Sequence, residues 1–260
     1  SGSHTFDADT DADLVFLSDD ALYSWVGRVL SSGDVDNDGF DELLVGSNGD
    51  YSYLLDDGLM GIGTVGADSE RVTSFEGGTG LIIGDVNDDG FDDALFGDRD
   101  PNWNTLMRLA YGSEDGLVAS SDEIRQSCIV SNGGEAPGCG TMMTADLDGD
   151  GSSDLGAIQS DGSGSYSSVH IRLYQGGPEW DVTSDYTFWA REALVSYQPW
   201  HKSAVHIIDD VTGDGRADLV FAYTDRTSPT DPYSGESIGG AGRAWLFEGG
   251  VADGGPTLLG

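Results

Sequence analysis

Four short segments carry oxygen-bearing side chains at alternate positions, followed by a glycine. They begin at Asp34, Asp85, Asp146 and Asp210, and each reads Asp-x-[Asp/Asn/Thr]-x-Asp-Gly-x-x-[Asp/Glu] over nine positions. Side chains at alternate positions of a tight loop can converge on one point, and oxygen atoms are the ligands that Ca²⁺ prefers. The pattern therefore predicts four cation-binding loops that hold about four Ca²⁺ ions.

Each loop offers five ligands, at positions 1, 3, 5, 7 and 9. Position 7 would contribute its backbone carbonyl, and the glycine at position 6 (Gly39, Gly90, Gly151 and Gly215) allows a reversal with positive φ. The predicted ligands are Asp34, Asp36, Asp38, Phe40 and Glu42; Asp85, Asn87, Asp89, Phe91 and Asp93; Asp146, Asp148, Asp150, Ser152 and Asp154; and Asp210, Thr212, Asp214, Arg216 and Asp218.

The EF-hand is the competing interpretation, because its calcium loop opens in the same way. It requires a bidentate Glu at position 12 and helices on both sides. Position 12 is Val45, Phe96, Ala157 or Phe221 here, and short apolar runs without a helical period follow each loop. The EF-hand is therefore rejected.

The loops resemble the calcium-binding FG-GAP repeats of integrin α-subunit β-propellers, and the resemblance covers all four units, roughly residues 20–250. In that family the ion loop lies between the first and second strands of a blade. The resemblance implies an all-β propeller that binds calcium. It does not carry the adhesive role of integrins with it, because function belongs to sites rather than to folds.

Short apolar runs between Gly/Asp/Ser turns predict about four antiparallel strands in each unit. The blades are expected at approximately residues 20–76, 77–131, 138–190 and 200–250 of a single domain over 5–260, with 1–4 a cloning remnant. The predicted strands are 25–32, 42–46, 51–55 and 71–75; 81–84, 93–96, 106–111 and 124–130; 141–145, 154–158, 168–174 and 186–190; and 204–208, 218–223 and 243–247.

The fourth unit lacks a fourth strand in this interpretation, because only residues 251–260 follow its third one. The N-terminal segment 12–17 is apolar and unassigned. We expect it to pair with 243–247 and close a four-bladed ring, which would remove two exposed sheet edges. The alternatives are a piece of a larger propeller and a ring completed by a second chain.

Charge limits the partners. The chain has 47 acidic and 11 basic residues and a formal net charge of −36. Nucleic acids are excluded, since phosphate binding needs clustered Lys and Arg, and no apolar run approaches the roughly 18 residues of a membrane span. We expect an extracellular or cell-surface protein, with Cys128 and Cys139 joined in a disulfide; the alternative is a pair of buried free thiols.

No catalytic motif stands out, so an enzyme is not expected. The loops opposite the ion loops would gather exposed aromatic and polar residues as a ligand-binding face, namely Trp103, Tyr197, Trp200, His201 and Tyr233. Such a face suits a protein or a glycan ligand. We expect a monomeric integrin-like adhesion or protein-interaction module. The alternatives are a carbohydrate-binding lectin propeller and a purely structural calcium-stabilised domain.

Overall fold

The computed structural model describes most of the chain. The described residues are 14–17, 26–27, 29–47, 51–59, 63–99, 105–126, 129–130, 134–135, 142–162, 166–196, 203–208, 210–224, 242–249 and 257–258. The chain forms two compact units, one of residues 1–84, 90–98 and 107–122, and one of residues 85–89, 99–106 and 123–260. Among the described residues there is no helix long and apolar enough to cross a membrane.

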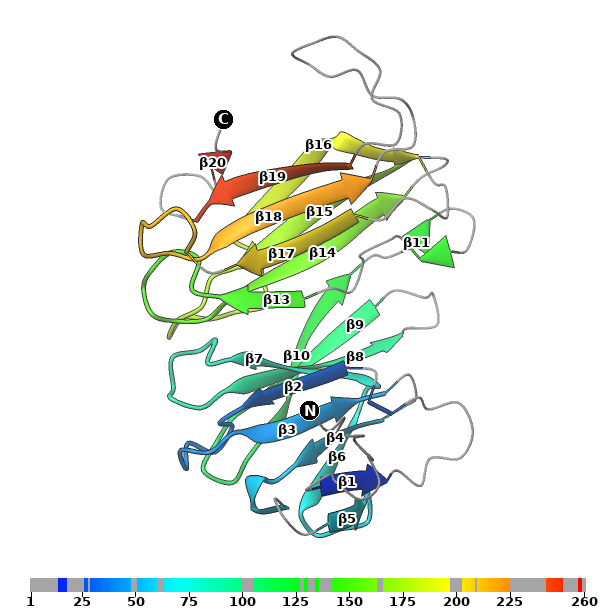
Figure 1. The fold of residues 1–260 in the computed structure, drawn as a ribbon, viewed down its shortest axis with the longest axis vertical. Helices are drawn as coiled ribbons and strands as arrows, with labels where there is room; N and C mark the ends of the chain where they lie inside the picture. The colour runs from blue at the N-terminus through cyan, green and yellow to red at the C-terminus, as the bar shows by residue number, and fades with distance from the viewer. Residues whose placement is uncertain are drawn as a thin grey trace, which may run out of the picture. The chain divides into compact units, whose positions relative to one another are not determined.

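The protein is all-β, with four four-stranded sheets (Figure 1). The first sheet has the order β2 (Val29–Gly33), β3 (Glu42–Gly46), β4 (Tyr51–Leu55) and β6 (Val72–Glu76). The second has β7 (Thr79–Gly84), β8 (Asp93–Arg99), β9 (Thr105–Tyr111) and β10 (Val118–Gln126). The third has β13 (Met142–Ala145), β14 (Asp154–Gly162), β15 (Tyr166–Tyr174) and β16 (Tyr186–Ser196), and the fourth β17 (Ser203–Ile208), β18 (Asp218–Thr224), β19 (Gly242–Glu248) and β20 (Thr257–Leu258).

Neighbouring strands pair antiparallel throughout the first, third and fourth sheets, and β7 pairs antiparallel with β8 in the second. Two small sheets complete the description: β1 (Leu14–Leu17) with β5 (Gly63–Gly66), and β11 (Ile129–Val130) with β12 (Gly134–Glu135). A 3₁₀ turn, η1, covers Asp57–Leu59. The expected sheets are confirmed as antiparallel strand sets, while their arrangement as propeller blades stays a prediction.

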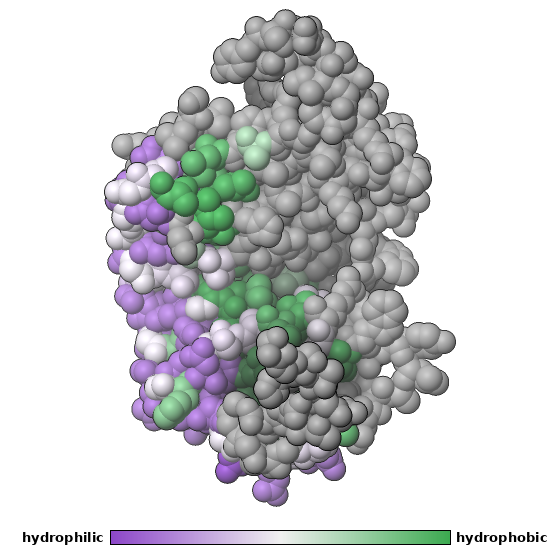
Figure 2. All heavy atoms as spheres, viewed as in Figure 1, coloured by the Kyte–Doolittle hydropathy of each residue, from purple (hydrophilic) through white to green (hydrophobic). Residues whose placement is uncertain are grey.

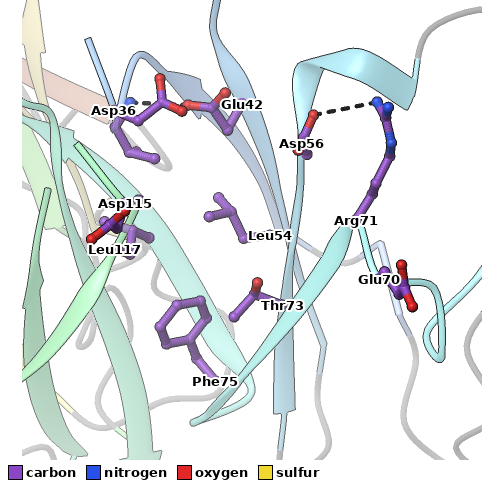
Figure 3. A pocket seen from close by; sticks show the side chains of 12 residues that line it. Asp36, Glu42, Leu54, Asp56, Glu70, Arg71, Thr73, Phe75, Asp115 and Leu117 are labelled. Atoms are coloured by element: carbon purple, nitrogen blue, oxygen red, sulfur yellow. Dashed lines mark hydrogen bonds and ion pairs between the residues drawn. The ribbon is translucent and has the colours of Figure 1, made fainter. Parts of the chain in front are cut away.

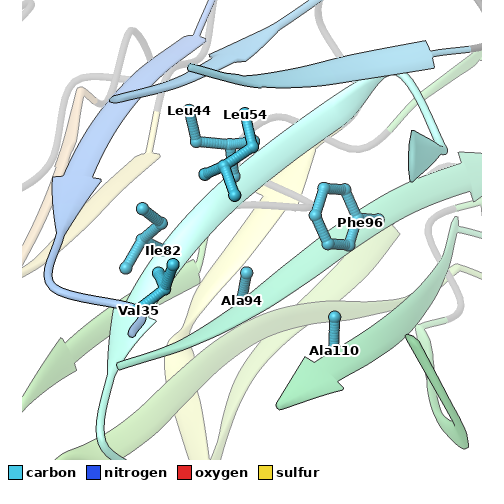
Figure 4. Packing of buried hydrophobic residues seen from close by; sticks show 7 residues of the cluster. All are labelled: Val35, Leu44, Leu54, Ile82, Ala94, Phe96 and Ala110. Carbon is cyan, nitrogen blue, oxygen red and sulfur yellow. The ribbon is translucent and has the colours of Figure 1, made fainter. Parts of the chain in front are cut away.

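Each predicted ion loop joins the first two strands of a four-stranded sheet, as the resemblance implied. The apolar runs after the loops form strands because both faces of the sheet are covered. In the first sheet, Leu44 and Leu54 pack on one face against Ile82, Ala94 and Phe96 of the second sheet (Figure 4). Burial on both faces accounts for the continuous apolar runs that replace a strict alternation.

The expected closing strand is wrong. Residues 14–17 form β1, which pairs in parallel with β5 rather than with β19. The reason is local packing: Leu14 and Phe16 contact the cluster of Val45, Tyr53, Leu55, Leu59 and Val65, and the Phe16 and Tyr53 ring centroids are 5.2 Å apart. Pairing with a strand closer in the chain also costs less loop-closure entropy.

The expectation that the fourth sheet lacks a fourth strand of its own is also wrong. Thr257–Leu258 forms β20 and pairs antiparallel with Phe247 and Glu248 at the end of β19. Two residues next to a proline and glycines give too short a signal to be recognised from sequence. Other strands differ mainly at their ends: β2 starts at Val29, β10 starts at Val118 and β16 extends to Ser196.

Candidate metal centres

The third loop shows how these segments are built. The Asp146 carboxylate accepts the backbone N–H groups of Asp150 and Gly151, at 3.1 and 3.0 Å. Asp148 accepts the Asp150 N–H at 3.1 Å, and Asp150 accepts the Ser152 N–H at 2.8 Å. Side chains at positions 1, 3 and 5 therefore fold the backbone around themselves, in the manner of Asx turns.

The same bonds recur in the other loops. The position-1 carboxylate accepts the position-5 N–H at 3.1 Å in all four loops, from Asp34, Asp85, Asp146 and Asp210. The position-5 carboxylate accepts the position-7 N–H in the first, third and fourth loops, at 2.9, 2.8 and 3.0 Å. The repeated sequence thus gives a repeated local geometry.

Two positions in each loop need a left-handed backbone. The predicted glycines at position 6 have φ of 95°, 93°, 99° and 89°, so this expectation is confirmed. Sequence reasoning missed the second requirement, at position 4, where Asn37, Asp88, Gly149 and Gly213 have φ of 57°, 59°, 82° and 83°. The signal was present, since Asn, Asp and Gly are the residues that tolerate this region best.

The position-9 carboxylates are buried at the base of the loops. Glu42, Asp93, Asp154 and Asp218 are 5%, 0%, 2% and 0% exposed. In the third loop one Asp154 oxygen accepts the N–H of Leu147, at position 2, at 2.7 Å. The other accepts the N–H of Gly176 at 2.8 Å. Position 9 therefore ties the loop to the third strand of its sheet.

Sequence reasoning missed a glycine that contacts the position-9 carboxylate in three of the sheets. The N–H of Gly112 donates to Asp93 at 3.0 Å and that of Gly249 donates to Asp218 at 3.0 Å, as the N–H of Gly176 does to Asp154. Each follows the third strand of its sheet within two residues. A glycine recurring just after that strand was the available signal. Gln175 was missed as well, and its side-chain amide donates to Asp148 at 2.8 Å.

The first loop departs from this scheme. Asp57 occupies the place of the recurring glycine. The residue after position 9 pairs with Leu55 in the first sheet and with Tyr174 in the third, and Asp57 and Gly176 each lie two residues further along the chain. The position-9 residue is the longer Glu42, whose carboxylate accepts the Val35 N–H at 3.0 Å. The first site therefore has one additional carboxylate nearby in place of a backbone donor.

Burial and backbone hydrogen bonds shift the pKa values of several loop carboxylates. Burial raises the pKa of Asp154 to about 6, although the Gly176 and Leu147 N–H groups oppose the shift. Burial raises the pKa of Glu42 to about 7, with repulsion from Asp36 adding to it. Asp210 differs: the N–H groups of its own loop, that of Gly215 foremost, hold its pKa below the ordinary value.

Two loops bring three carboxylates together closely enough for one ion. Oxygens of Asp34, Asp36 and Asp38 lie within 4.8 Å of one another, and so do oxygens of Asp146, Asp148 and Asp154. Two oxygens bound to one Ca²⁺ at roughly 2.3–2.6 Å are separated by at most about 5 Å. The spacing and the all-oxygen donor set therefore fit a calcium ion.

A polar cavity of about 170 Å³ adjoins the first loop (Figure 3). Asp36 and Glu42 face it from the loop side, and Leu54, Thr73 and Phe75 line it from the sheet. Arg71 lies at its edge, 3.8 Å from the Asp56 carboxylate. Its volume accommodates several water molecules, so that water can reach Glu42 and complete the coordination of an ion in this loop.

In each unit the described hydrophilic residues gather on the side where the ion loops lie (Figure 2). The predicted ligand-binding residues Trp103, Tyr197, Trp200, His201 and Tyr233 lie outside the described residues, as do both cysteines of the expected disulfide. Their roles therefore stay predictions.

The fourth site is expected to lose calcium first as the free ion concentration falls. Positions 1, 3, 5 and 9 carry four carboxylates in the first and third loops and three in the second and fourth, and the fourth differs from the second by neutral Thr212 and the nearby basic residue Arg216. Lower ligand charge weakens calcium binding. Replacing Thr212 by Asp should tighten this site by roughly tenfold, measured by calorimetric titration, while Thr212→Ser should leave it unchanged. Equal affinity in all three proteins would contradict this ranking.

Two known proteins are similar to part of the chain. It is 30% identical over 159 residues to the phosphatidylinositol-glycan-specific phospholipase D of Rattus norvegicus, and 29% identical over 157 residues to that of Mus musculus. Each match covers 51% of this chain and 18% of the relative, so the chain spans less than a fifth of these proteins. No family model matches the chain. The chain is thus weakly homologous to part of these phospholipases.

Proposed function

We propose that the chain is a calcium-binding, integrin-like β-propeller whose four sheets are blades, and that it acts as an extracellular adhesion or protein-interaction module. The observation that carries the proposal is the common bonding of the loops, in which the position-1 carboxylate accepts the position-5 N–H at 3.1 Å four times over. Unrelated solvated acidic turns would not be expected to repeat this geometry four times. Four sites that bind the same ion would be expected to repeat it.

Calcium suits these sites better than a transition metal. Of the twenty predicted ligands, sixteen are oxygen-bearing side chains of Asp, Asn, Glu or Thr and four are the backbone carbonyls at position 7, so the donor set can be entirely oxygen. Hard cations with six to eight ligands prefer such sets, whereas zinc and copper favour His and Cys. Titration by calorimetry should show about four Ca²⁺ bound per chain, and absence of uptake would overturn the proposal.

A binding role is favoured over catalysis. The carboxylates that recur at fixed spacing are held by backbone N–H groups of their own loops, which scaffolds an ion rather than an acid–base pair. The hydrolytic activity in the names of the two relatives belongs to proteins of which the chain matches 18%. We therefore propose that the chain contributes recognition and not the chemical step.

The interaction role can be tested with the chain immobilised on beads. In millimolar calcium it should retain a cell-surface or secreted protein from a detergent extract, and EGTA should release that protein. The same sample applied to a glycan array should give no signal. A glycan signal without a protein partner would instead identify a lectin propeller.

The calcium-free protein should become more stable as the pH falls from 8 to 5. In the folded state the pKa of Asp154 is raised to about 6 and that of Glu42 to about 7. Between the ordinary pKa of each carboxyl group and its raised value, the folded state binds more protons than the unfolded state. The ionised carboxylates therefore lower the free energy of unfolding fully above pH 7, and this loss of stability is relieved as protons bind at lower pH. Melting in EGTA across this range tests the prediction, with Asp154→Asn expected to flatten the profile. A melting temperature that rises with pH would contradict it.

Calcium affinity should change in the opposite sense. Ions bind the deprotonated carboxylates, so calcium binding releases protons and weakens as the pH falls below about 7.

A further inference from the structure

The Asp148 carboxylate, at position 3 of the third loop, is held at both of its oxygen atoms. One oxygen accepts the Asp150 N–H at 3.1 Å, a bond within the loop. The other accepts the side-chain amide of Gln175 at 2.8 Å, from outside the loop. Because an ionised carboxylate can only accept, the Gln175 contact is made by its NH₂ group. Two bonds fix the plane of the carboxylate, whereas the loop bond alone would let it turn.

Gln175 reaches Asp148 from a backbone that is itself held in place. It directly follows β15, and its N–H donates to the Asp185 carboxylate at 2.8 Å. The next N–H, that of Gly176, donates to Asp154 at position 9, also at 2.8 Å. Two neighbouring residues after the third strand therefore contact the carboxylates at positions 3 and 9. These are two of the three carboxylates whose oxygens lie within 4.8 Å of one another in this loop.

The other three sheets have a different residue at the place of Gln175. The residues directly before the recurring glycine, or before Asp57 in its place, are Asp56, Tyr111 and Glu248. Ionised Asp and Glu side chains cannot donate to a carboxylate, and the Tyr111 hydroxyl donates to Asp122 at 2.9 Å. The bond within the loop is shared, since the Asp38 N–H donates to Asp36 in the first loop at 3.2 Å. An amide at this place is therefore particular to the third site.

We propose that Gln175 is a positioning residue of the third calcium site, which holds the Asp148 carboxylate in the orientation that an ion in this loop requires. The inference rests on the proposed calcium binding. A carboxylate oxygen that accepts one hydrogen bond keeps a second lone pair for an ion. A side chain that is already ordered loses less conformational entropy when the ion binds. Outer partners that orient a metal ligand typically account for 10–100-fold in metal affinity.

Calcium titration followed by NMR of glycine-labelled protein can test the sites one by one. The position-6 N–H groups of Gly39, Gly151 and Gly215 donate to the position-1 carboxylates of their own loops, at 3.0, 3.0 and 2.7 Å. Because each of these carboxylates is a predicted ligand, each glycine signal reports calcium binding in its own loop. Calorimetry on the same samples gives the total uptake, and circular dichroism checks the fold.

Gln175→Met keeps the length of the side chain and removes the donor. The Gly151 signal should then need about tenfold more calcium to complete its shift, while the Gly39 and Gly215 signals respond as in the wild type. Thr183→Val is the matched control, because it removes a neutral polar group at an exposed position of the same connection between β15 and β16. This variant should leave all three glycine signals unchanged.

Gln175→Glu is the second variant, since it keeps both the length and the polarity of the side chain. It replaces the donor by an acceptor that repels Asp148, so the third site should again weaken. Tighter binding in this variant would identify residue 175 as a direct ligand and would overturn the positioning role.

Two further outcomes would overturn the inference alone. One is an unchanged Gly151 response in Gln175→Met, and the other is an equal loss at Gly39 and Gly215, which a merely structural role predicts. A wild-type protein that takes up no calcium, with no glycine signal responding, would overturn the proposed function instead.

Discussion

Removing calcium with EGTA at neutral pH is expected to lower the melting temperature sharply and to abolish the cooperative transition at body temperature. An ion that binds only the folded state stabilises it by RT ln(1 + [Ca²⁺]/Kd), which is roughly 1.5–3 kcal/mol per site at millimolar calcium and affinities of about 10–100 μM. Four such sites together rival the roughly 5–15 kcal/mol that separates folded from unfolded domains.

The physical reason lies in the loops themselves. Without an ion, oxygens of Asp146, Asp148 and Asp154 stand within 4.8 Å of one another, and Asp154 is 2% exposed. Differential scanning calorimetry in calcium, in EGTA and after calcium is added back measures the effect. Magnesium at equal concentration is the control, because it demands a smaller and more rigid shell. A melting temperature that EGTA leaves unchanged would show that the loops hold their shape without ions.

The ion loops could be predicted because their determinants are local. Asp146 bonds with residues four and five positions away, and Gly151 supplies the positive φ at the reversal, so nine residues contain most of the information. The strands after the loops could be predicted for the same reason, since each is a short apolar run bounded by turn residues. Residue pairs far apart in the chain carry no such signal.

The sheet partners of β1 and the existence of β20 depend on distant contacts. Phe16 selects its place through Tyr53, which is 37 positions further along the chain, and the apolar pattern of 14–17 is compatible with any half-covered sheet edge. The register of Phe247 with Leu258 involves only two residues of β20. Short strands of this kind are defined by the surface they meet and not by their own composition.

Glu42 and Asp57 are the two acids by which the first site differs from the other three. From sequence, Glu42 was only a longer ligand than the Asp of the other loops. The structure connects it to the loss of the glycine donor after the third strand, since Asp57 stands where Gly176 donates to Asp154. Repulsion from Asp57 contributes to the raised pKa of Glu42, after burial and after repulsion from Asp36 and Asp38. The first site is therefore a variant built from two coupled changes.

The glycine after the third strand should be intolerant of any side chain. A Cβ atom on Gly112 would lie 2.5 Å from the Phe91 Cβ, 2.6 Å from the Asp92 carbonyl oxygen and 2.8 Å from the Val35 carbonyl oxygen. The two oxygens belong to the backbone of the second and first loops, and a backbone atom cannot rotate away as the end of a side chain can. Gly112→Ala should also weaken the N–H bond to the buried Asp93 carboxylate, which is 3.0 Å long. Overpacking and a weakened charge-assisted bond together cost roughly 2–4 kcal/mol.

Gly66→Ala is the matched control for this substitution. Its added Cβ would also lie 2.6 Å from an oxygen, but that atom is the Asp68 side-chain carboxylate, and the Gly66 backbone is not left-handed. An exposed carboxylate can rotate away, and alanine reduces the entropy of the unfolded chain, so Gly66→Ala should change stability by less than about 1 kcal/mol. Urea unfolding in saturating calcium compares the two variants. If Gly112→Ala unfolds at the same urea concentration as Gly66→Ala, the prediction is contradicted. The carbonyl oxygens of Asp92 and Val35 would then be able to move away from the added Cβ atom at little cost in stability.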